Sequence, residues 1–375
     1  MKTTGDQQLV KRINRSVILR LIRKQPYLSR AEIAGISGLT KSTVSMLVQS
    51  LIAEGWLVEG NKTSDSPASE PRLGRPSTPL QIDHARKGLV GVEVAVDVVR
   101  VVGVSLTGQV LCNIEEALTS KEPAAVCLQA AKLIAKARLD LKKRRMALHG
   151  IGVGLPGAFD EATGILTFAP NLGWRNVDFV PLMTRALARA GVPPVPVHVQ
   201  NEADTAALSE YEFFSETAKD SLIFVTCGVG VGAGIVLNDR LFTGVQGMAG
   251  EIGHSILQVD GAQCSCGRRG CAETFFGERV LGKLKNPDDG GHYLGLVLHN
   301  LWTTFNPGAL VVGGSSCALY PNMIDVARKT FASYADSAGI APALEVRTAH
   351  YGLLASAVGA AALILHHELR PLNLK

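Results

Sequence analysis

Three cysteines and a histidine gather between residues 247 and 273, in the stretch GMAGEIGHSILQVDGAQCSCGRRGCAE. The four are His254, Cys264, Cys266 and Cys271. Three thiolates and one imidazole form the ligand set of a closed tetrahedral zinc site, so we predict a structural zinc here. Gly267 and Gly270 are expected to let the chain turn tightly enough for the thiols to face one point. The alternative is a group of core cysteines or a disulfide.

Two glutamates, Glu251 and Glu273, bracket this cluster. A zinc-bound imidazole keeps its second nitrogen free to hydrogen-bond, and the metal would fix the orientation of the ring. If that nitrogen faces a cleft, His254 can hold a ligand hydroxyl and both glutamates can accept further hydroxyls. The pattern therefore predicts a polyol or sugar pocket in which the metal is structural and not catalytic.

Two further segments could line such a pocket. Asn201 and Glu202 follow an apolar run and open a helical stretch, which would place them at the carboxyl end of a strand, where clefts form. They could equally be a helix cap with an acidic first turn. Asn171 and Trp174 lie in one loop, and an amide beside an aromatic ring is common in sugar sites. A packed surface loop has the same pattern.

Positive charge is concentrated in the N-terminal quarter of the chain. Residues 1–90 contain 14 Lys and Arg and 7 Asp and Glu, whereas the remainder contains 24 and 26. An excess of positive charge on a small segment indicates a polyanionic partner such as double-stranded DNA.

The same segment has the pattern of a winged helix-turn-helix. Apolar spacing predicts three helices, the first ended by Pro26, the second opened by the Ser29–Glu32 capping box and the third running from Thr40 to Ile52. A short strand follows at 56–58. In this geometry the third helix enters the major groove, and its outward polar residues are Thr40, Lys41, Ser42, Thr43, Ser45 and Gln49. The alternative is a helical dimerisation module.

Other basic residues are candidates for backbone and minor-groove contacts. Arg30 opens the second helix and could contact phosphate. Arg72 and Arg75 lie in a stretch rich in Ser, Pro and Gly, where an extended arm could enter a minor groove, or where the chain is simply a flexible linker. We therefore expect a DNA-binding domain at 1–62, a wing and linker at 63–87, and a ligand-binding body at 88–375.

The body has the pattern of an α/β protein with two lobes. Three successive strands are expected from residue 89, then strands and helices alternate twice, ending in a helix over about 352–369. The chain has no run of 18 apolar residues and no signal-peptide core, so no membrane span is expected. The chain has seven cysteines, and the four outside the cluster lie in apolar settings, which fits a reducing cytoplasm.

Taken together, these motifs resemble the ROK family of sugar-dependent repressors and sugar kinases. The most specific match is Glu-x-Gly-His followed by Cys-x-Cys-Gly-x-x-Gly-Cys-x-Glu over residues 251–273. The resemblance implies an actin-like, ribonuclease-H-like domain of two lobes, and a homodimer or tetramer. It implies the same four zinc ligands, with sugar hydroxyls held between the lobes by Asn171, Asn201, Glu202, Glu251, His254 and Glu273.

Two departures from the kinase members favour a repressor. The phosphate-cradling Asp-x-Gly-Gly-Thr turn of the kinases is matched here by Glu93–Asp97, which has no glycine pair. The catalytic Asn-Asp pair is matched by Asn201-Glu202, whose longer arm displaces the oxygen, and a misplacement of ~1 Å can lower a rate ~100-fold. A glutamate at the position of Glu202 also resembles the residue found there in the xylose-responsive repressors of the family. We predict a non-enzymatic, cytoplasmic repressor of sugar-utilisation genes. The alternatives are an ATP-dependent sugar kinase and a repressor controlled by a protein partner.

Overall fold

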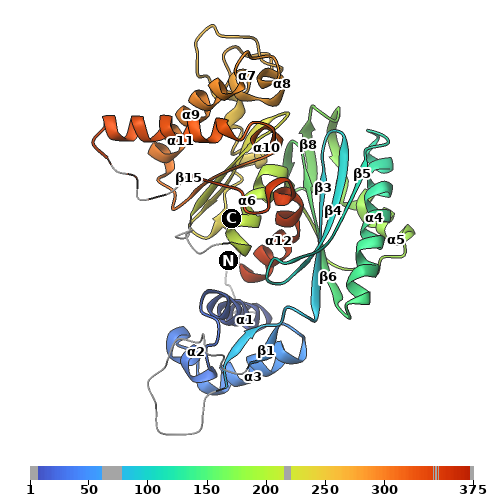
Figure 1. The fold of residues 1–375 in the computed structure, drawn as a ribbon. Coiled ribbons are helices and arrows are strands. Elements are labelled where there is room, and N and C mark those ends of the chain that lie inside the picture. Colours follow the sequence, from blue (N-terminus) through green and yellow to red (C-terminus); the bar gives the residue numbers. More distant parts are fainter. Residues whose placement is uncertain are drawn as a thin grey trace, which may run out of the picture.

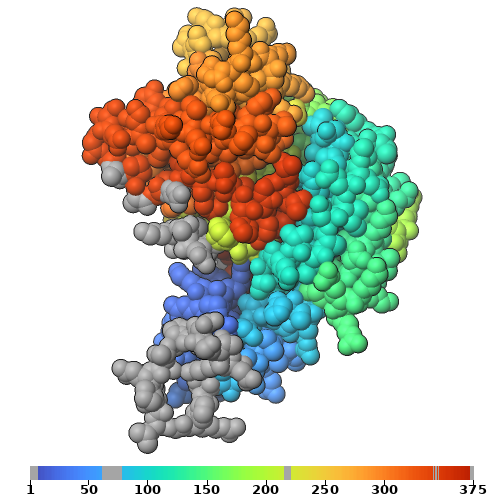
Figure 2. All heavy atoms as spheres, viewed as in Figure 1, coloured from blue at the N-terminus to red at the C-terminus, as the bar shows by residue number. Residues whose placement is uncertain are grey.

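The structure is a computed structural model that describes residues 7–60, 78–214, 221–340, 342, 344 and 346–371. An N-terminal helical segment lies below two lobes, each built on its own sheet, and two helices run between the lobes (Figure 1). Figure 2 shows the blue N-terminal segment set off from the lobes, with residues of the last helix visible in the notch between them.

The N-terminal segment folds as three helices and a two-stranded wing: α1 (Gln7–Lys24), α2 (Arg30–Ser37), α3 (Lys41–Ala53), β1 (Leu57–Glu59) and β2 (Leu80–Ile82). The predicted capping box of α2 is present, and the Thr40 side chain caps α3 by accepting from the Thr43 amide. β2, which the sequence did not predict, pairs antiparallel with β1. The helices pack on one another through apolar residues that include Ile18, Ile22 and Leu51.

Each lobe contains a five-stranded sheet with the same order of strands. The first has the order β5-β4-β3-β6-β10, and the second has β13-β12-β11-β14-β15. In both, three antiparallel strands are followed by two parallel ones, which is the duplicated ribonuclease-H-like arrangement that the sequence predicted.

The first lobe is built from near-continuous valine and glycine strands, as expected for a sheet buried on both faces. Its elements are β3 (Lys87–Val94), β4 (Val98–Ser105), β5 (Val110–Ala117), α4 (Pro123–Lys143), β6 (Ala147–Leu155), α5 (Phe179–Arg189) and β10 (Val197–Asn201). The three successive strands predicted from residue 89 are confirmed. A small antiparallel sheet, which was not predicted, comprises β7 (Ala158–Asp160), β8 (Ile165–Ala169) and β9 (Trp174–Asp178).

The second lobe carries the cysteine cluster in the segment between β13 and α7, whose bounds are given below. Its strands are β11 (Leu222–Cys227), β12 (Val231–Leu237), β13 (Arg240–Leu241), β14 (Leu310–Gly313) and β15 (Val346–Thr348). Its longer helices are α9 (Gly290–Phe305) and α11 (Asn322–Ser337). Shorter ones are η1 (Val245–Gly247), η2 (Ile252–His254), α7 (Glu273–Phe276), α8 (Glu278–Leu281), η3 (Pro287–Asp289) and α10 (Ser315–Leu319).

Helices α6 (Glu202–Phe213) and α12 (Ala355–Leu369), the latter preceded by η4 (Gly352–Leu354), lie between the lobes. They approach so closely that a Cβ on Gly359 would lie 1.5 Å from the Thr205 carbonyl oxygen, so only glycine fits there. Among the described residues, Gly352–Leu369 alone has the length and composition of a membrane span, with mean hydropathy 1.4. It is 72% buried in the fold, which accounts for its apolar character.

Candidate functional site

The four predicted metal ligands come together in the structure. The nearest donor atoms of His254, Cys264, Cys266 and Cys271 all lie within 4.8 Å of one another. The Sγ of Cys264 is 3.6 Å from Nδ1 of His254, and the Sγ atoms of Cys266 and Cys271 are 3.7 Å apart. A tetrahedron with metal–sulfur bonds of ~2.3 Å has edges of roughly 3.7 Å, so the donor set and its spacing fit a metal ion of the zinc type.

The chain around the cluster is folded by backbone hydrogen bonds and by two glycines. The Cys264 amide donates to the Arg268 carbonyl at 2.8 Å, which closes the turn containing Cys266. Gly267 and Gly270 have φ of 88° and 70°, as the tight turn requires. Desolvation would raise the pKa of Cys266, but hydrogen bonds from Arg268 and from the neighbouring thiols lower it to about 6. Its thiolate, the form that binds a metal, is therefore accessible near neutral pH.

The two bracketing glutamates have different surroundings. Glu273 opens α7, and its carboxylate accepts from the Val231 amide at 3.4 Å and from the Ser265 hydroxyl at 3.5 Å. It thereby joins the cysteine loop to the start of β12. Glu251 precedes η2 and is exposed. His254 offers Nδ1 to the thiol side, which leaves Nε2 as the nitrogen for another partner.

A cavity of about 330 Å³ lies between the lobes. Its walls carry several carboxylates and one guanidinium, together with the glycine turn after β11 and the start of α12. The charged and amide residues that line it are Glu93, Asp97, Arg100, Glu115, Asn171, Glu202 and Glu278. Of the predicted sugar ligands, Asn171 and Glu202 are therefore in this wall, whereas Glu251, His254 and Glu273 belong to the neighbouring cysteine loop.

Glu202 is an acid of the cavity whose pKa lies well above its ordinary value. It is the first residue of α6, and burial together with the carboxylates of Glu93 and Glu251 raises its pKa to about 8. It is therefore mainly protonated at neutral pH and can donate as well as accept a hydrogen bond. Asn201 acts as the helix cap that the sequence left open as an alternative: its Oδ1 accepts from the Ala203 amide at 2.7 Å, and its Nδ2 donates to the Gly157 carbonyl at 2.8 Å.

An ion-pair group centred on Arg100 lines the cavity beside Glu93–Asp97, the segment that the resemblance matched to the phosphate turn of the kinases. Arg100 of β4 donates to the Glu93 carboxylate, lies 2.8 Å from Glu115, and donates to the Leu353 carbonyl at 3.2 Å. Arg100 was not predicted from the sequence, although a lone arginine in the valine-rich strand 98–104 was a signal of a buried carboxylate partner. The contact with Leu353 also ties the first lobe to the turn that starts α12.

On the N-terminal segment, α3 presents the predicted polar face. Lys41, Ser42, Ser45 and Gln49 are exposed, whereas Val44, Leu47, Val48 and Leu51 are buried. The hydroxyls of Thr40, Ser42 and Thr43 hydrogen-bond to one another at the start of the helix, so part of this face is already engaged in capping.

Arg30 is paired in the structure. Its guanidinium lies 2.8 Å from Glu59 on the wing strand, and both line a hollow with Ser45 and Gln49. A phosphate contact by Arg30 would therefore compete with this ion pair. Arg72 and Arg75 lie outside the described residues.

Comparisons with known proteins agree with this architecture. Residues 89–288 match the model of the ROK family, and residues 17–60 match an IclR helix-turn-helix domain. The chain is 28% identical to the xylose repressor of Bacillus subtilis over 390 residues, covering 97% of this chain and 98% of that protein.

Solved structures that resemble the chain include a transcriptional regulator and a kinase. A ROK family transcriptional regulator, described as a homologue of the E. coli MLC protein, superposes with a TM-score of 0.76 at 20% identity, covering 96% of this chain and 98% of that chain. A glucokinase from Streptomyces griseus superposes with a TM-score of 0.62 at 25% identity, covering 74% of this chain and 98% of that chain.

Proposed function

The chain belongs to the ROK family, and from that premise we propose that it is a cytoplasmic transcriptional repressor of sugar-utilisation genes, controlled by a sugar that binds between the lobes. The observation that carries the proposal is the combination, in one chain, of an exposed polar helix α3 on a winged helix-turn-helix and an interlobe cavity with Glu202 in its wall. The similarity to named xylose repressors supports a pentose as the first sugar to test.

Zinc would hold the cysteine loop in place and would take no part in chemistry. The residues that would bind it are His254, Cys264, Cys266 and Cys271, whose donor spacing fits the ion. When bound, the metal supplies a fixed orientation for the His254 ring, so that Nε2 can hydrogen-bond a sugar hydroxyl. Glu251, Glu273 and Glu202 would accept or donate the remaining hydrogen bonds, with Asn171 also in the cavity wall and Asn201 supporting the start of α6.

DNA recognition would place two copies of α3 on the half-sites of a palindromic operator, as a homodimer or tetramer permits. Lys41 would contact phosphate or guanine, whereas Ser45 and Gln49 would face base edges. Ligand binding would favour one angle between the lobes and so change the distance between the two recognition helices. A measurement of DNA affinity with and without sugar gives both the size of the response and its direction, that is, whether sugar weakens or strengthens DNA binding.

Catalysis by this chain is disfavoured by the occupants of the cavity. If Glu93–Asp97 corresponds to the phosphate turn of the kinase members, ATP phosphates there would meet the carboxylates of Glu93 and Glu115, both bound by Arg100, and those carboxylates would repel them. We therefore propose that the cavity binds sugar without phosphoryl transfer.

The test measures sugar binding, DNA binding and turnover on one full-length preparation. A thermal-shift screen over pentoses, hexoses and amino sugars should find at least one stabilising sugar, and the same sugar should change the affinity for a DNA duplex selected from a random pool. A coupled ATP assay with that panel should give no turnover. Turnover lost in Glu202→Gln would instead establish the kinase, and no shift with any sugar would favour control by a protein partner.

A further inference from the structure

Helix α6 connects the interlobe cavity with the DNA-binding segment. Its first residue, Glu202, lines the cavity, and Glu212 near its other end contacts Arg23 of α1. At a rise of ~1.5 Å per residue, the two glutamates are roughly 15 Å apart along the helix axis. A single element therefore touches both the proposed effector site and the proposed DNA-reading segment.

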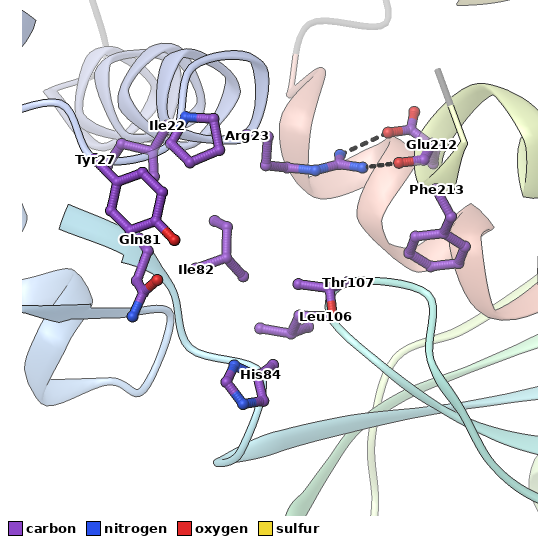
Figure 3. A pocket seen from close by; sticks show the side chains of 11 residues that line it. Ile22, Arg23, Tyr27, Gln81, Ile82, His84, Leu106, Thr107, Glu212 and Phe213 are labelled. Carbon is purple, nitrogen blue, oxygen red and sulfur yellow. Dashed lines mark hydrogen bonds and ion pairs between the residues drawn. The ribbon is translucent and has the colours of Figure 1, made fainter. Parts of the chain in front are cut away.

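The contact at the far end is a two-point arginine clamp. Arg23 donates from Nη1 to the Glu212 carboxylate at 2.6 Å and from Nη2 to the Glu212 backbone carbonyl (Figure 3). The planar guanidinium therefore binds both the side chain and the backbone at the helix end, and a lysine ammonium lacks the fork of donors that does this. The clamp lies beside a cavity of about 320 Å³ between α1, the strand β2 and the body, which is also lined by Tyr27 and His84.

Glu212 is held firmly from the body side as well. Its side chain is 3% exposed and accepts from Arg370 at 2.7 Å and from Nδ1 of His366 at 2.8 Å, both near the end of α12. Arg23 therefore joins an ion-pair group that is already anchored. Because Arg370 and His366 remain, removal of Arg23 does not leave a buried carboxylate unpaired.

The body of α6 has no room to absorb a displacement. Residues 203–212 are all buried. A Cβ on Gly234 of β12 would lie 2.1 Å from the Ala203 carbonyl oxygen, and one on Gly359 of α12 would lie 1.5 Å from that of Thr205. Since close-packed interiors transmit strain, a shift of Glu202 moves the whole helix and with it Glu212.

We propose that α6 transmits the effector response from the cavity to the DNA-binding segment, and that the Arg23–Glu212 clamp is the contact through which it acts. The proposal rests on the proposed function, since it requires a ligand that binds beside Glu202. A second ion pair joins α1 to the second lobe, from Arg20 to Asp239 at 2.5 Å, but Arg20 is half exposed and Asp239 lies outside α6. Asp239 also accepts from the hydroxyl of Tyr211 on α6 at 2.7 Å and pairs with Arg370, so this ion pair is a second, more exposed link between α1 and the same group of contacts.

The test compares the full-length wild type with Arg23→Met and Arg23→Lys, and with Lys24→Met as control. Lys24 is the exposed next residue of the same helix, so its substitution removes the same charge without touching the clamp. For each protein the affinity for the selected duplex is measured by fluorescence anisotropy, without sugar and at saturating sugar, and the affinity for sugar alone is measured by calorimetry.

Couplings of this kind change affinity about 5- to 150-fold. In Arg23→Met, the fold-change in DNA affinity between no sugar and saturating sugar should be at least ~5-fold smaller than in wild type. The affinity of this variant for sugar should stay within about twofold of wild type. Arg23→Lys should lie between, and Lys24→Met should match wild type. An unchanged ratio in Arg23→Met, or in Arg23→Lys if the methionine variant does not fold, overturns the clamp. A wild type that binds sugar with no change in DNA affinity overturns the proposed function, and the coupling with it.

Discussion

Replacing Glu202 by glutamine tests the electrostatics of the cavity directly. The folded chain keeps a proton on Glu202 that the unfolded chain has released, because burial and the Glu93 and Glu251 carboxylates raise its pKa from the ordinary 4.5 to about 8. The stability of the wild type should therefore fall as the pH rises from about 4.5 to about 8, and its contribution should level off above that range.

The magnitude follows from the same two values. Each pH unit between the two pKa values corresponds to ~1.4 kcal/mol. The tendency of Glu202 to ionise, which is met more easily in the unfolded chain, therefore lowers the free energy of unfolding by on the order of 1 kcal/mol at pH 5.5 and by on the order of 3–5 kcal/mol at pH 9. Glutamine has nearly the same shape as glutamic acid, and its side chain has no proton that titrates in this pH range. The Glu202→Gln variant should therefore become more stable than wild type by an amount that grows by ~3 kcal/mol between these two pH values.

Urea denaturation of both proteins without sugar, at pH 5.5 and pH 9, measures this difference. The control is Glu116→Gln on β5, where the carboxylate is well exposed and pairs with Lys136 on the surface. Its difference from wild type should be small and should not grow with pH. If the advantage of Glu202→Gln is the same at both pH values, Glu202 is already ionised at pH 5.5, and the description of the cavity as an acidic, desolvated pocket is wrong.

Three further changes test other parts of the molecule. Cys266→Ser should remove about one equivalent of zinc, measured by atomic absorption, and lower the sugar response in gel shifts before DNA binding is lost; full zinc content would contradict the ligand assignment. Gly359→Ala should destabilise the fold by more than ~3 kcal/mol in urea, because its Cβ meets the Thr205 carbonyl, whereas Gly35→Ala, with nothing within 4 Å, should be neutral or stabilising. Lys41→Met should reduce the slope of log K for DNA against log salt by about one, and an unchanged slope would exclude a phosphate contact.

Much of the fold could be predicted because it depends on local patterns. The capping box at Ser29, the Thr40 cap and the apolar spacing that follows are properties of a few consecutive residues, and the structure has them where the sequence placed them. The valine-rich strands from residue 87 likewise need only their own apolar, β-branched composition and the turns between them. Elements with weak local patterns, such as β2 and the sheet β7-β8-β9, were missed because pairing partners create them.

Within the candidate site, the same division holds. The sequence alone determined the metal-type cluster, since all four donors lie within 18 residues and two glycines fold that stretch on itself. It left Asn201 open between cap and ligand, because the answer depends on whether the carbonyl of Gly157, in the turn between β6 and β7, accepts a hydrogen bond from its amide.

Only the tertiary structure decided which distant side chains meet. Arg23 and Glu212 are 189 positions apart, and Arg100 and Leu353 are 253 apart, so no spacing rule relates them. These contacts exist because α6 and α12 pack between the lobes at backbone distance and present their ends to the cavity and to α1. The sequence thus determined what the chemical groups are and how each folds locally. The packing of helices against sheets decided which of them can act on one another, because side-chain contact requires position in space and not order along the chain.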